Sequence, residues 1–530
     1  MKKTMKQAVR QIAVTSLFTL VTATTVFAGE VHPITAPELD ALIQHSMHTF
    51  NVPGIAVAVI KDDKVIYAKG FGVRSLNTGA KVDEHTLFGI ASNSKAFTTA
   101  ALAILVDEKK IKWDDKVTDI IPEFKMYSPY VTDEFTIRDL LTHRSGLGLG
   151  AGDLMLWPEG SDVTRTDIIH NLRYLKPTSS FRSKYDYDNN LYIVAGEVIA
   201  RVSGMSWEDF IQQRIFQPLG MTESYVSFQR VANRSNIIEP HVEIDGKVQV
   251  VDAEINEVAN AAAGINTNLN DLSKWVRMQL NGGKYGTDAH LFSDKAQQEM
   301  WSPQTILPVS ATNNFYNTHF SAYGLGWGIS DVNGYKQLSH TGGLTGIVTQ
   351  VTMIPELKLG IVVLTNQQEG AAFSSITNTI KDSYFGMPKV DRVAQYKKQV
   401  SDKDDADEAK VKAVWATVEA NQKNPSACQL DPANITGTYH DAWFGDVVIS
   451  YQDGALHFQA KHSPRLNGVM YFYKGNSYAV KWHDRYMLAD AYAIFSLDKN
   501  GKPTGFKMEK ISDLTDFSYD FQDLDLKRVE

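Results

Sequence analysis

The sequence predicts a mixed α/β domain, built on an antiparallel sheet flanked by helices, followed by a C-terminal antiparallel β-barrel. A strand–turn–strand pattern at residues 52–79 and two apolar, strand-like runs at 349–355 and 360–366 enclose several helical patterns. From about residue 435 onward, roughly eight short strand-like runs alternate with turn pairs such as Asp-Gly and Asn-Gly. Because hairpins join antiparallel strands and the intervening helices need a sheet face to cover, a doubly wound parallel sheet is not expected.

The first 28 residues are typical of a cleavable secretion signal. The apolar run from Ile12 to Val26 is too short to span about 30 Å of hydrocarbon, and small residues at its end predict cleavage after Ala28. Four basic residues precede this run: Lys2, Lys3, Lys6 and Arg10. We therefore expect a secreted or periplasmic protein without a stable membrane span; an uncleaved anchor is the alternative.

Length and composition exclude some classes of function. The 530 residues exceed what one core usually fills, and a chain with 43% apolar and 22% charged residues is typical of soluble globular proteins. Removal of the four cations of the signal takes the formal net charge from −8 to −12, which disfavours a nucleic-acid partner. Cys428 is the only cysteine, so no intrachain disulfide can form.

The order of the elements divides the rest of the chain into three parts. Residues 29–388 carry the α/β pattern, and residues 429–530 carry the barrel pattern. The intervening residues 389–428 are charged and helix-prone, which predicts a linker with one or two exposed helices. Within the α/β part, apolar spacing predicts helices at 94–106, near the start of 137–147, at 190–202, within 258–281 and at 293–301.

A serine with a lysine three residues later, Ser92 and Lys95, begins the first helical run. Residues at this spacing share one helix face, so the lysine can reach the serine hydroxyl. A desolvated lysine can have its pKa lowered enough to activate a serine, and amides at a helix N-terminus favour a developing negative charge. The alternative is that Lys95 lies at a helix end, with its aliphatic stem packed on the protein and its ammonium group in solvent.

The same spacing recurs at Ser496 and Lys499 and provides a control. Those residues lie in the polar sequence SLDKNG, so Lys499 is expected to be a solvated charge at a hairpin tip. Lys95 instead precedes the apolar sequence FTTAALAIL. The spacing alone is therefore not specific, and further motifs are needed to decide whether Ser92 and Lys95 are catalytic.

Those motifs follow in order: YDN at 187–189, before a helical run, and HTGG at 340–343, after a strand-like run. Together with LLTHRSGL at 140–147 and YGLGWGI at 323–329, they resemble the penicillin-recognising serine hydrolases, which include class C β-lactamases, DD-peptidases, D-aminopeptidases and esterases. That family carries S-x-x-K, then Y-x-N, then K-T-G or H-T-G. The resemblance covers roughly residues 36–385 and implies the β-lactamase/transpeptidase-like fold.

The resemblance implies catalytic roles for three residues. Ser92 would be the acylated nucleophile, and Lys95 would tune the proton-transfer network one helical turn on. Tyr187 would be the proton shuttle, with a pKa lowered by nearby cations. The alternatives are that Tyr187 is a buried structural phenol, or that Tyr185 takes its place. Only Tyr187 has an asparagine two residues later, which favours it.

The resemblance also implies substrate-binding roles. Asn189 would position the substrate amide, and His340 and Thr341 would lie on a strand edge beside the substrate. The amides of Ser92 and Gly343 would form the oxyanion hole, worth about 3–4 kcal/mol per donor. Asn189 could instead be a helix N-cap, and His340 a buried structural histidine. A serine mechanism needs no metal and no cofactor, so a small-molecule or peptide substrate is the only ligand expected.

Two departures from the family pattern bear on the substrate. The family's β-lactamases usually carry lysine where this chain has His340; lysine is a cation suited to a substrate carboxylate, whereas histidine titrates near neutrality. The departure favours peptide or ester hydrolysis over β-lactam hydrolysis. The other departure is the pair of acids beside Tyr187. If Asp186 and Asp188 faced the site they would raise the tyrosine pKa, so both are expected to point away.

The sequence therefore predicts an exported serine hydrolase that acts through an acyl-enzyme on Ser92. Its expected substrates are peptides or amides, including those with D-amino acids, or small esters. The alternatives are a class C type β-lactamase and a penicillin or peptidoglycan sensor that does not turn over. The barrel, which begins with ITGTYHD at 435–441, resembles the lipocalin-like domains appended to some of these hydrolases. We expect it either to restrict substrate size at the cleft or to act as a structural cap. The oligomeric state is left open.

Overall fold

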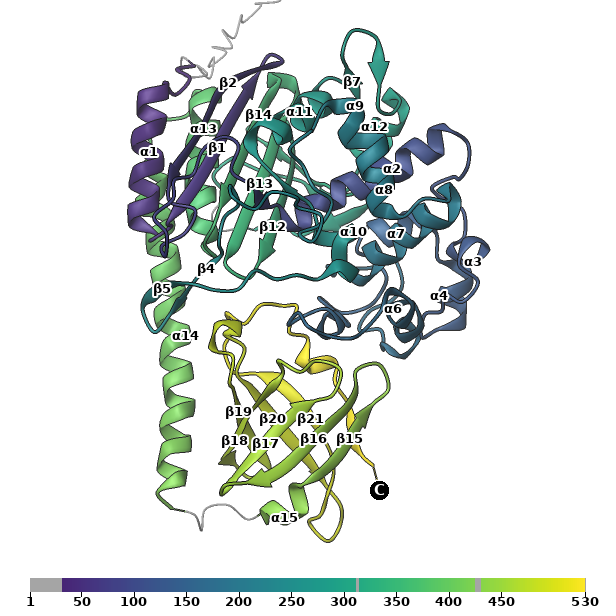
Figure 1. The fold of residues 1–530 in the computed structure, drawn as a ribbon, viewed down its shortest axis with the longest axis vertical. Helices are drawn as coiled ribbons and strands as arrows, with labels where there is room; N and C mark the ends of the chain where they lie inside the picture. The colour runs from purple at the N-terminus through teal and green to yellow at the C-terminus, as the bar shows by residue number, and fades with distance from the viewer. Residues whose placement is uncertain (1–30, 311–313, 425–429, 530) are drawn as a thin grey trace, which may run out of the picture.

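The computed structural model of the protein describes residues 31–310, 314–424 and 430–529. The expected secretion signal and Cys428 lie outside these residues. Figure 1 shows a large α/β domain at the top, a β-barrel below it, and one long helix running beside both. No helix in the described ranges is both long enough and apolar enough to cross a membrane.

The α/β domain is built on an eight-stranded sheet in which every neighbouring pair is antiparallel, with the order β2-β1-β14-β13-β12-β11-β10-β9. The first strand of the domain, β1, therefore pairs directly with its last strand, β14. The β1–β2 turn at Asp62 and Asp63 has left-handed backbone angles at both residues, as a tight hairpin requires. The strands are β1 (Gly54–Lys61), β2 (Lys64–Gly72), β9 (Thr305–Leu307), β10 (Ser321–Tyr323), β11 (Gly328–Val332), β12 (Tyr335–Leu344), β13 (Ile347–Ile354) and β14 (Leu359–Thr365).

Helices cover both faces of this sheet, which explains why its central strands are apolar on both sides. Along β14, Ile361 and Val363 pack toward α1 and α13, whereas Val362 and Leu364 belong to the core on the opposite face. The helices of the domain are α1 (Ala36–Thr49), α2 (Ser94–Asp107), α3 (Val117–Ile120), α4 (Pro129–Glu134), α5 (Ile137–Leu141), α6 (Arg165–Asn171), α7 (Asn190–Ser203), α8 (Trp207–Ile211), α9 (Gln217–Leu219), α10 (Asn260–Ala263), α11 (Leu269–Leu280), α12 (Asp294–Met300) and α13 (Gly370–Tyr384).

The predicted helices are confirmed, with one refinement. The predicted 258–281 region contains two helices, α10 and α11, because the short strand β6 (Asn266–Thr267) separates them. Helix α2 is buried on every side from Ser94 to Leu105, and its alanines let neighbouring helices approach closely. The remaining short strands form three two-stranded sheets: β3 (Phe88–Gly89) with β6, β4 (His241–Ile244) with β5 (Lys247–Val250), and β7 (Lys284–Tyr285) with β8 (Ala289–His290).

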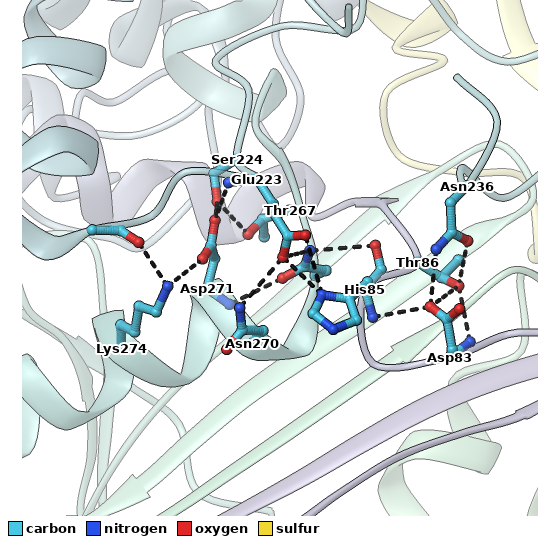
Figure 2. A network of polar contacts seen from close by, with 12 residues as sticks. Asp83, His85, Thr86, Glu223, Ser224, Asn236, Thr267, Asn270, Asp271 and Lys274 are labelled. Carbon is cyan, nitrogen blue, oxygen red and sulfur yellow. Dashed lines mark hydrogen bonds and ion pairs between the residues drawn. The ribbon is translucent and has the colours of Figure 1, made fainter. Parts of the chain in front are cut away.

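A polar network holds the segment that leads into α2 (Figure 2). Asp271 in the first turn of α11 is fully buried and accepts hydrogen bonds from the Glu223 amide at 2.7 Å and from Lys274 Nζ at 2.8 Å. Glu223 in turn contacts His85 Nδ1 at 2.9 Å. Three residues after His85, strand β3 begins and pairs with β6. This network therefore anchors the chain just before the predicted nucleophile.

The described part of the predicted linker, residues 389–424, contains one helix, α14 (Arg392–Gln422), which agrees with the expected number. Most of its side chains are not buried, as expected, but its two ends pack on different domains. Near its start, Val393 joins the core beneath α1 and α13. Near its end, Val414 and Val418 pack on the barrel residues Ala479 and Ile511. The weak apolar spacing along the sequence hid these two contacts because they lie on different turns far apart on the helix.

The barrel is closed and antiparallel, and its eight strands match the predicted number. Its interior is filled by buried aromatic rings, among them those of Tyr439, Phe458 and Trp482. After the short helix α15 (Pro432–Ile435), the strands are β15 (Gly437–Asp441), β16 (Gly445–Gln452), β17 (Ala455–Ala460), β18 (Asn467–Lys474), β19 (Ser477–Trp482), β20 (Ala491–Leu497), β21 (Pro503–Lys510) and β22 (Leu526–Arg528).

Candidate active site

Ser92 lies in a tight 3₁₀ turn, Ala91–Asn93, directly before α2. Ala91 has a φ of 48°, a left-handed conformation that costs about 1–3 kcal/mol for a residue with a side chain. Strand β12 presses on this turn, since a Cβ added at Gly342 would lie 2.2 Å from the Ile90 carbonyl oxygen. The turn is thus held in a strained shape by the sheet, and it presents Ser92 at the wall of a cleft.

Lys95 is completely buried, which excludes the alternative that its ammonium group extends into solvent. Its Nζ lies 3.0 Å from Ser92 Oγ, 2.7 Å from Asn189 Oδ1 and 3.1 Å from the Ala262 carbonyl oxygen. Burial lowers the pKa of Lys95 to about 7, against the opposing charges of Asp153 and Asp188. In contrast, Ser496 and Lys499 are both exposed at a hairpin tip, as predicted.

The three contacts of Lys95 fit an ammonium, which donates to all three oxygens, and they also fit the neutral amine that a pKa of about 7 makes available. A neutral amine has two N–H groups and one lone pair. The Asn189 and Ala262 oxygens can only accept, so they take the two N–H groups. The lone pair then faces Ser92 Oγ, where it can accept the hydroxyl hydrogen. The arrangement can therefore remove a proton from Ser92 at neutral pH.

The expectation of a lowered pKa for Tyr187 is wrong. Burial raises the pKa of Tyr187 well above its usual value, and the opposing effect of Ser92 is smaller. The Lys95 Nζ lies 4.8 Å from the centre of its ring, so a cation is nearby but does not reach the phenol oxygen. The hydroxyl is buried and has no hydrogen-bond partner among the described residues. Tyr187 is therefore a neutral phenol with a donor hydrogen available in the cleft.

The acidic neighbours of Tyr187 point away, as expected. Asp186 pairs with Lys184 at 2.9 Å, and Asp188 Oδ1 accepts the Leu191 amide at 3.2 Å in the first turn of α7. Burial raises the pKa of Asp188 to about 7. The Asp188 backbone amide donates to Nδ1 of His143. The His143 ring packs against the Tyr187 ring, with 4.2 Å between their centres and 32° between their planes.

Sequence reasoning missed Asp153, the carboxyl whose charge acts most strongly on Lys95. Asp153 is fully buried and accepts a hydrogen bond from Asn189 Nδ2 at 2.7 Å. Burial and the nearby Asp188 raise the pKa of Asp153 well above its usual value. It lies in a glycine-rich loop, GLGLGAGD, that matched no motif.

Asn189 links Lys95 to Asp153 rather than capping a helix. Its Oδ1 accepts from Lys95 and its Nδ2 donates to Asp153, while its side chain makes no capping hydrogen bond to α7. Nδ2 carries a second N–H, and Asn189 lines the cleft. The side chain can therefore position Lys95 and offer one donor to a substrate.

The HTGG motif lies on the edge of β12, as expected. Strand β11 begins at Gly328, opposite Ser339, so β11 does not cover this edge from His340 onward. Thr341 and Gly343 are exposed, and a Cβ at Gly343 would meet nothing within 4 Å. The amides of Ser92 and Gly343 therefore border the same cleft, an arrangement that can serve as an oxyanion hole.

His340 does not titrate near neutrality, contrary to expectation. Its Nδ1 donates to the Thr341 carbonyl at 2.6 Å, so its Nε2 accepts from the Tyr323 hydroxyl at 2.9 Å. Burial, and next the charge of Lys95, lower the pKa of His340 to about 4. His340 is therefore a neutral ring at physiological pH and cannot serve as a cation for a substrate carboxylate.

The cleft has a volume of about 670 Å³ and is lined by both domains. The barrel contributes residues from two segments, 486–488 and 514–519. Two acids, Glu254 and Asp516, line the cleft, and none of its described lining residues is a lysine or an arginine. Within the described ranges, no three histidine, cysteine, aspartate or glutamate side chains come together as a metal site would require. With two acids and no lysine or arginine among its described lining residues, the cleft is a mildly acidic groove between the domains.

Several known proteins resemble this chain. The unguisins hydrolase ungD of Aspergillus violaceofuscus is 27% identical over 442 residues, which are 78% of this chain and 77% of that protein. The unguisins hydrolase ungD' of Aspergillus campestris is 30% identical over 61% of this chain and 60% of its own length. Protein flp of Staphylococcus aureus strain N315 is 29% identical over 62% of each chain.

The fold also has a counterpart among solved structures. The octameric penicillin-binding protein homologue from Pyrococcus abyssi superposes with a TM-score of 0.60 and 21% identity, covering 93% of this chain and all of that one. The barrel region, residues 422–528, matches a domain of unknown function, DUF3471. The Beta-lactamase family model matches residues 39–383, which is more than half of the chain. The chain therefore belongs to the beta-lactamase family.

Proposed function

We propose that this protein is a serine hydrolase that forms an acyl-enzyme on Ser92 while it hydrolyses peptides, amides or small esters. The observation that carries the proposal is the contact between Ser92 Oγ and a completely buried Lys95 with a pKa of about 7. Family membership and hydrolase-named relatives support a hydrolase. The serine mechanism is inferred from the geometry of the site.

In the proposed reaction, Ser92 Oγ attacks the substrate carbonyl carbon as its proton passes to neutral Lys95. The resulting oxyanion accepts hydrogen bonds from the amides of Ser92 and Gly343. The carbon–nitrogen or carbon–oxygen bond then breaks, and the leaving group takes the proton held by the Lys95 ammonium while the Tyr187 hydroxyl donates a hydrogen bond to it. Water attacks the acyl-enzyme with Lys95 again accepting a proton, and Ser92 recovers its hydrogen as the acid product leaves.

The charge of the cleft supports neutral or amine-bearing substrates over anionic ones. A substrate carboxylate would meet Glu254 and Asp516 and would find only a neutral His340 on the β12 edge. A substrate ammonium would instead be attracted by the two acids. This favours aminoacyl amides, peptides with a free amino group and uncharged esters over β-lactams and peptides recognised by their C-terminal carboxylate.

A serine-reactive phosphonate probe tests the proposal. Mass spectrometry should locate the label on Ser92 in the wild type and find none in Ser92→Ala. Ser496→Ala is the matched control, because Ser496 has the same lysine spacing but an exposed position. Absence of label on Ser92 in the wild type would refute the serine mechanism. Labelling without turnover of aminoacyl amides, peptides, esters or nitrocefin would favour a sensor.

We also infer that the protein acts outside the cytoplasm, on the basis of the secretion signal at residues 1–28. Fractionation of cells that express the full chain tests this inference. The expected result is a mature protein that begins at Gly29 in the periplasm or medium. A cytoplasmic protein that retains Met1 would contradict it.

A further inference from the structure

The loop between β21 and β22, residues 511–525, leaves the barrel and enters the α/β domain. Asp520 in this loop is completely buried. Its Oδ2 accepts the Gly152 amide at 2.6 Å, and its Oδ1 accepts the Leu154 amide at 2.9 Å. One carboxylate of the barrel therefore holds two backbone amides of the other domain.

Those two amides flank Asp153 on either side, so Asp520 fixes the turn that carries it. Asp153 receives Asn189 Nδ2 at 2.7 Å, and Asn189 Oδ1 receives Lys95 Nζ at 2.7 Å. Lys95 in turn contacts Ser92. A continuous chain of short polar contacts thus runs from the barrel to the nucleophile.

A second contact of the same loop reaches the other catalytic candidate. The ring of Phe517 meets the ring of Tyr187 edge-on, with 5.6 Å between their centres. The carbonyl oxygen of Phe517 lies so close to Gly150 that a Cβ there would be 2.5 Å away. The barrel loop and the glycine-rich loop are therefore fitted to each other over their length, and the fit does not depend on Asp520 alone.

The chemistry of this contact is costly for a purely structural interface. Burial raises the pKa of Asp520 well above its usual value, and the carboxyls of Asp523 and Asp153 add to the shift. Asp188 also lies near, since the charge of Asp523 raises its pKa. Apolar side chains would join the two domains without crowding carboxyls in a dry space. A buried hydrogen-bond acceptor, unlike an apolar side chain, holds the two amides on either side of Asp153 in a fixed position.

We propose that Asp520 is a positioning residue for the active site, and that the barrel is part of the catalytic apparatus through its contact with the Asp153 turn. Asp520 touches neither substrate nor Ser92; it acts by holding Asp153 against Asn189, which sets the position of Lys95. The proposal rests on the proposed function of Ser92 and Lys95. Because small displacements of a positioned base are costly, loosening this turn slows acylation for small and large substrates alike.

The test measures the second-order rate constant for phosphonate labelling of Ser92 from about pH 5 to about pH 9, together with thermal unfolding. We expect Asp520→Ala to lower the rate constant about 10- to 100-fold and to move the pH midpoint. Asp520→Asn should cause a smaller loss, because its amide oxygen can still accept one of the two amides. His462→Ala is the matched control: His462 Nδ1 lies 2.7 Å from Asp162 Oδ1 across the same domain interface, and Asp162 lies outside the turn that carries Asp153.

The control should keep the wild-type rate constant within about twofold and leave the pH midpoint unchanged, since its contact does not reach Lys95. Wild-type rates and midpoints in both Asp520 variants would overturn the proposal. An equal loss in His462→Ala would also overturn it, because the effect would then be general loosening of the interface. If Asp520→Ala does not fold, the nearly isosteric Asp520→Asn decides. A wild type that takes up no label would refute the proposed function instead.

Discussion

The role of Lys95 as the base that activates Ser92 makes a sharp prediction for pH dependence. With a pKa of about 7, roughly one-tenth of the lysine is neutral at about pH 6 and roughly nine-tenths at about pH 8. If the neutral form accepts the proton of Ser92, the rate constant for phosphonate labelling should rise about tenfold over this interval. A role as a fixed cation would produce the opposite trend, because the charge is lost as the pH rises.

The variant Lys95→Arg separates the two roles. Arginine keeps the positive charge but stays protonated in the whole range, so it cannot accept a proton. We expect the labelling rate constant at about pH 8 to fall by about 10²- to 10⁴-fold, the usual worth of a general base, and the rise with pH to disappear. Labelling that stays fast in Lys95→Arg, or that falls with rising pH in the wild type, would refute the reasoning.

A second buried lysine is the control. Lys381 is also buried with a pKa lowered to about 7, but it donates to Gln337 Oε1 at 2.7 Å, beside Asp382 and Arg392 and not in the cleft. Lys381→Arg should leave the midpoint of the labelling profile unchanged. A shift of that midpoint by the Lys381 variant would show that the profile reports stability and not the ionisation of Lys95.

Three further predictions concern the sheet, a buried acid and the mouth of the cleft. Gly342→Ala places a Cβ 2.2 Å from the Ile90 carbonyl and should lower stability by about 1–3 kcal/mol, whereas Gly343→Ala, which meets open space, should unfold at the wild-type temperature. Burial raises the pKa of Asp188 to about 7, so its contribution to stability is full below its unfolded pKa of about 4 and is lost as the pH rises through about 7. Asp188→Asn should therefore raise the unfolding temperature more at pH 8 than at pH 5. An equal change at both pH values would contradict the raised pKa of Asp188. A clear rise in the rate of Ser92 acylation in this variant would show that Asp188 faces the site. Phe517→Ala widens the cleft between the domains and should improve kcat/KM for long peptides more than for short amides; unchanged selectivity would favour a barrel that merely caps the fold.

Much of the fold could be predicted because its signals are local. The Asp62–Asp63 turn, the apolar helix after Ser92 and the alternating barrel strands each lie within a few residues of sequence. The candidate nucleophile and base could be found for the same reason, since Lys95 lies only three positions after Ser92 in the sequence. The order of the later motifs then distinguished Ser92 from Ser496.

The sequence by itself therefore determined the set of helices and strands and, through the family resemblance, the candidate reacting groups. The tertiary structure alone decided their chemistry. Burial by distant segments lowers the pKa of Lys95, keeps His340 neutral and raises the pKa of Tyr187, which reverses one expectation and changes another. The tertiary structure also brings Asp520, which lies 367 residues after Asp153 in the chain, to the turn that carries Asp153, where it accepts two backbone amides. Desolvation and such long-range contacts depend on which segments meet in space, and no local pattern records that.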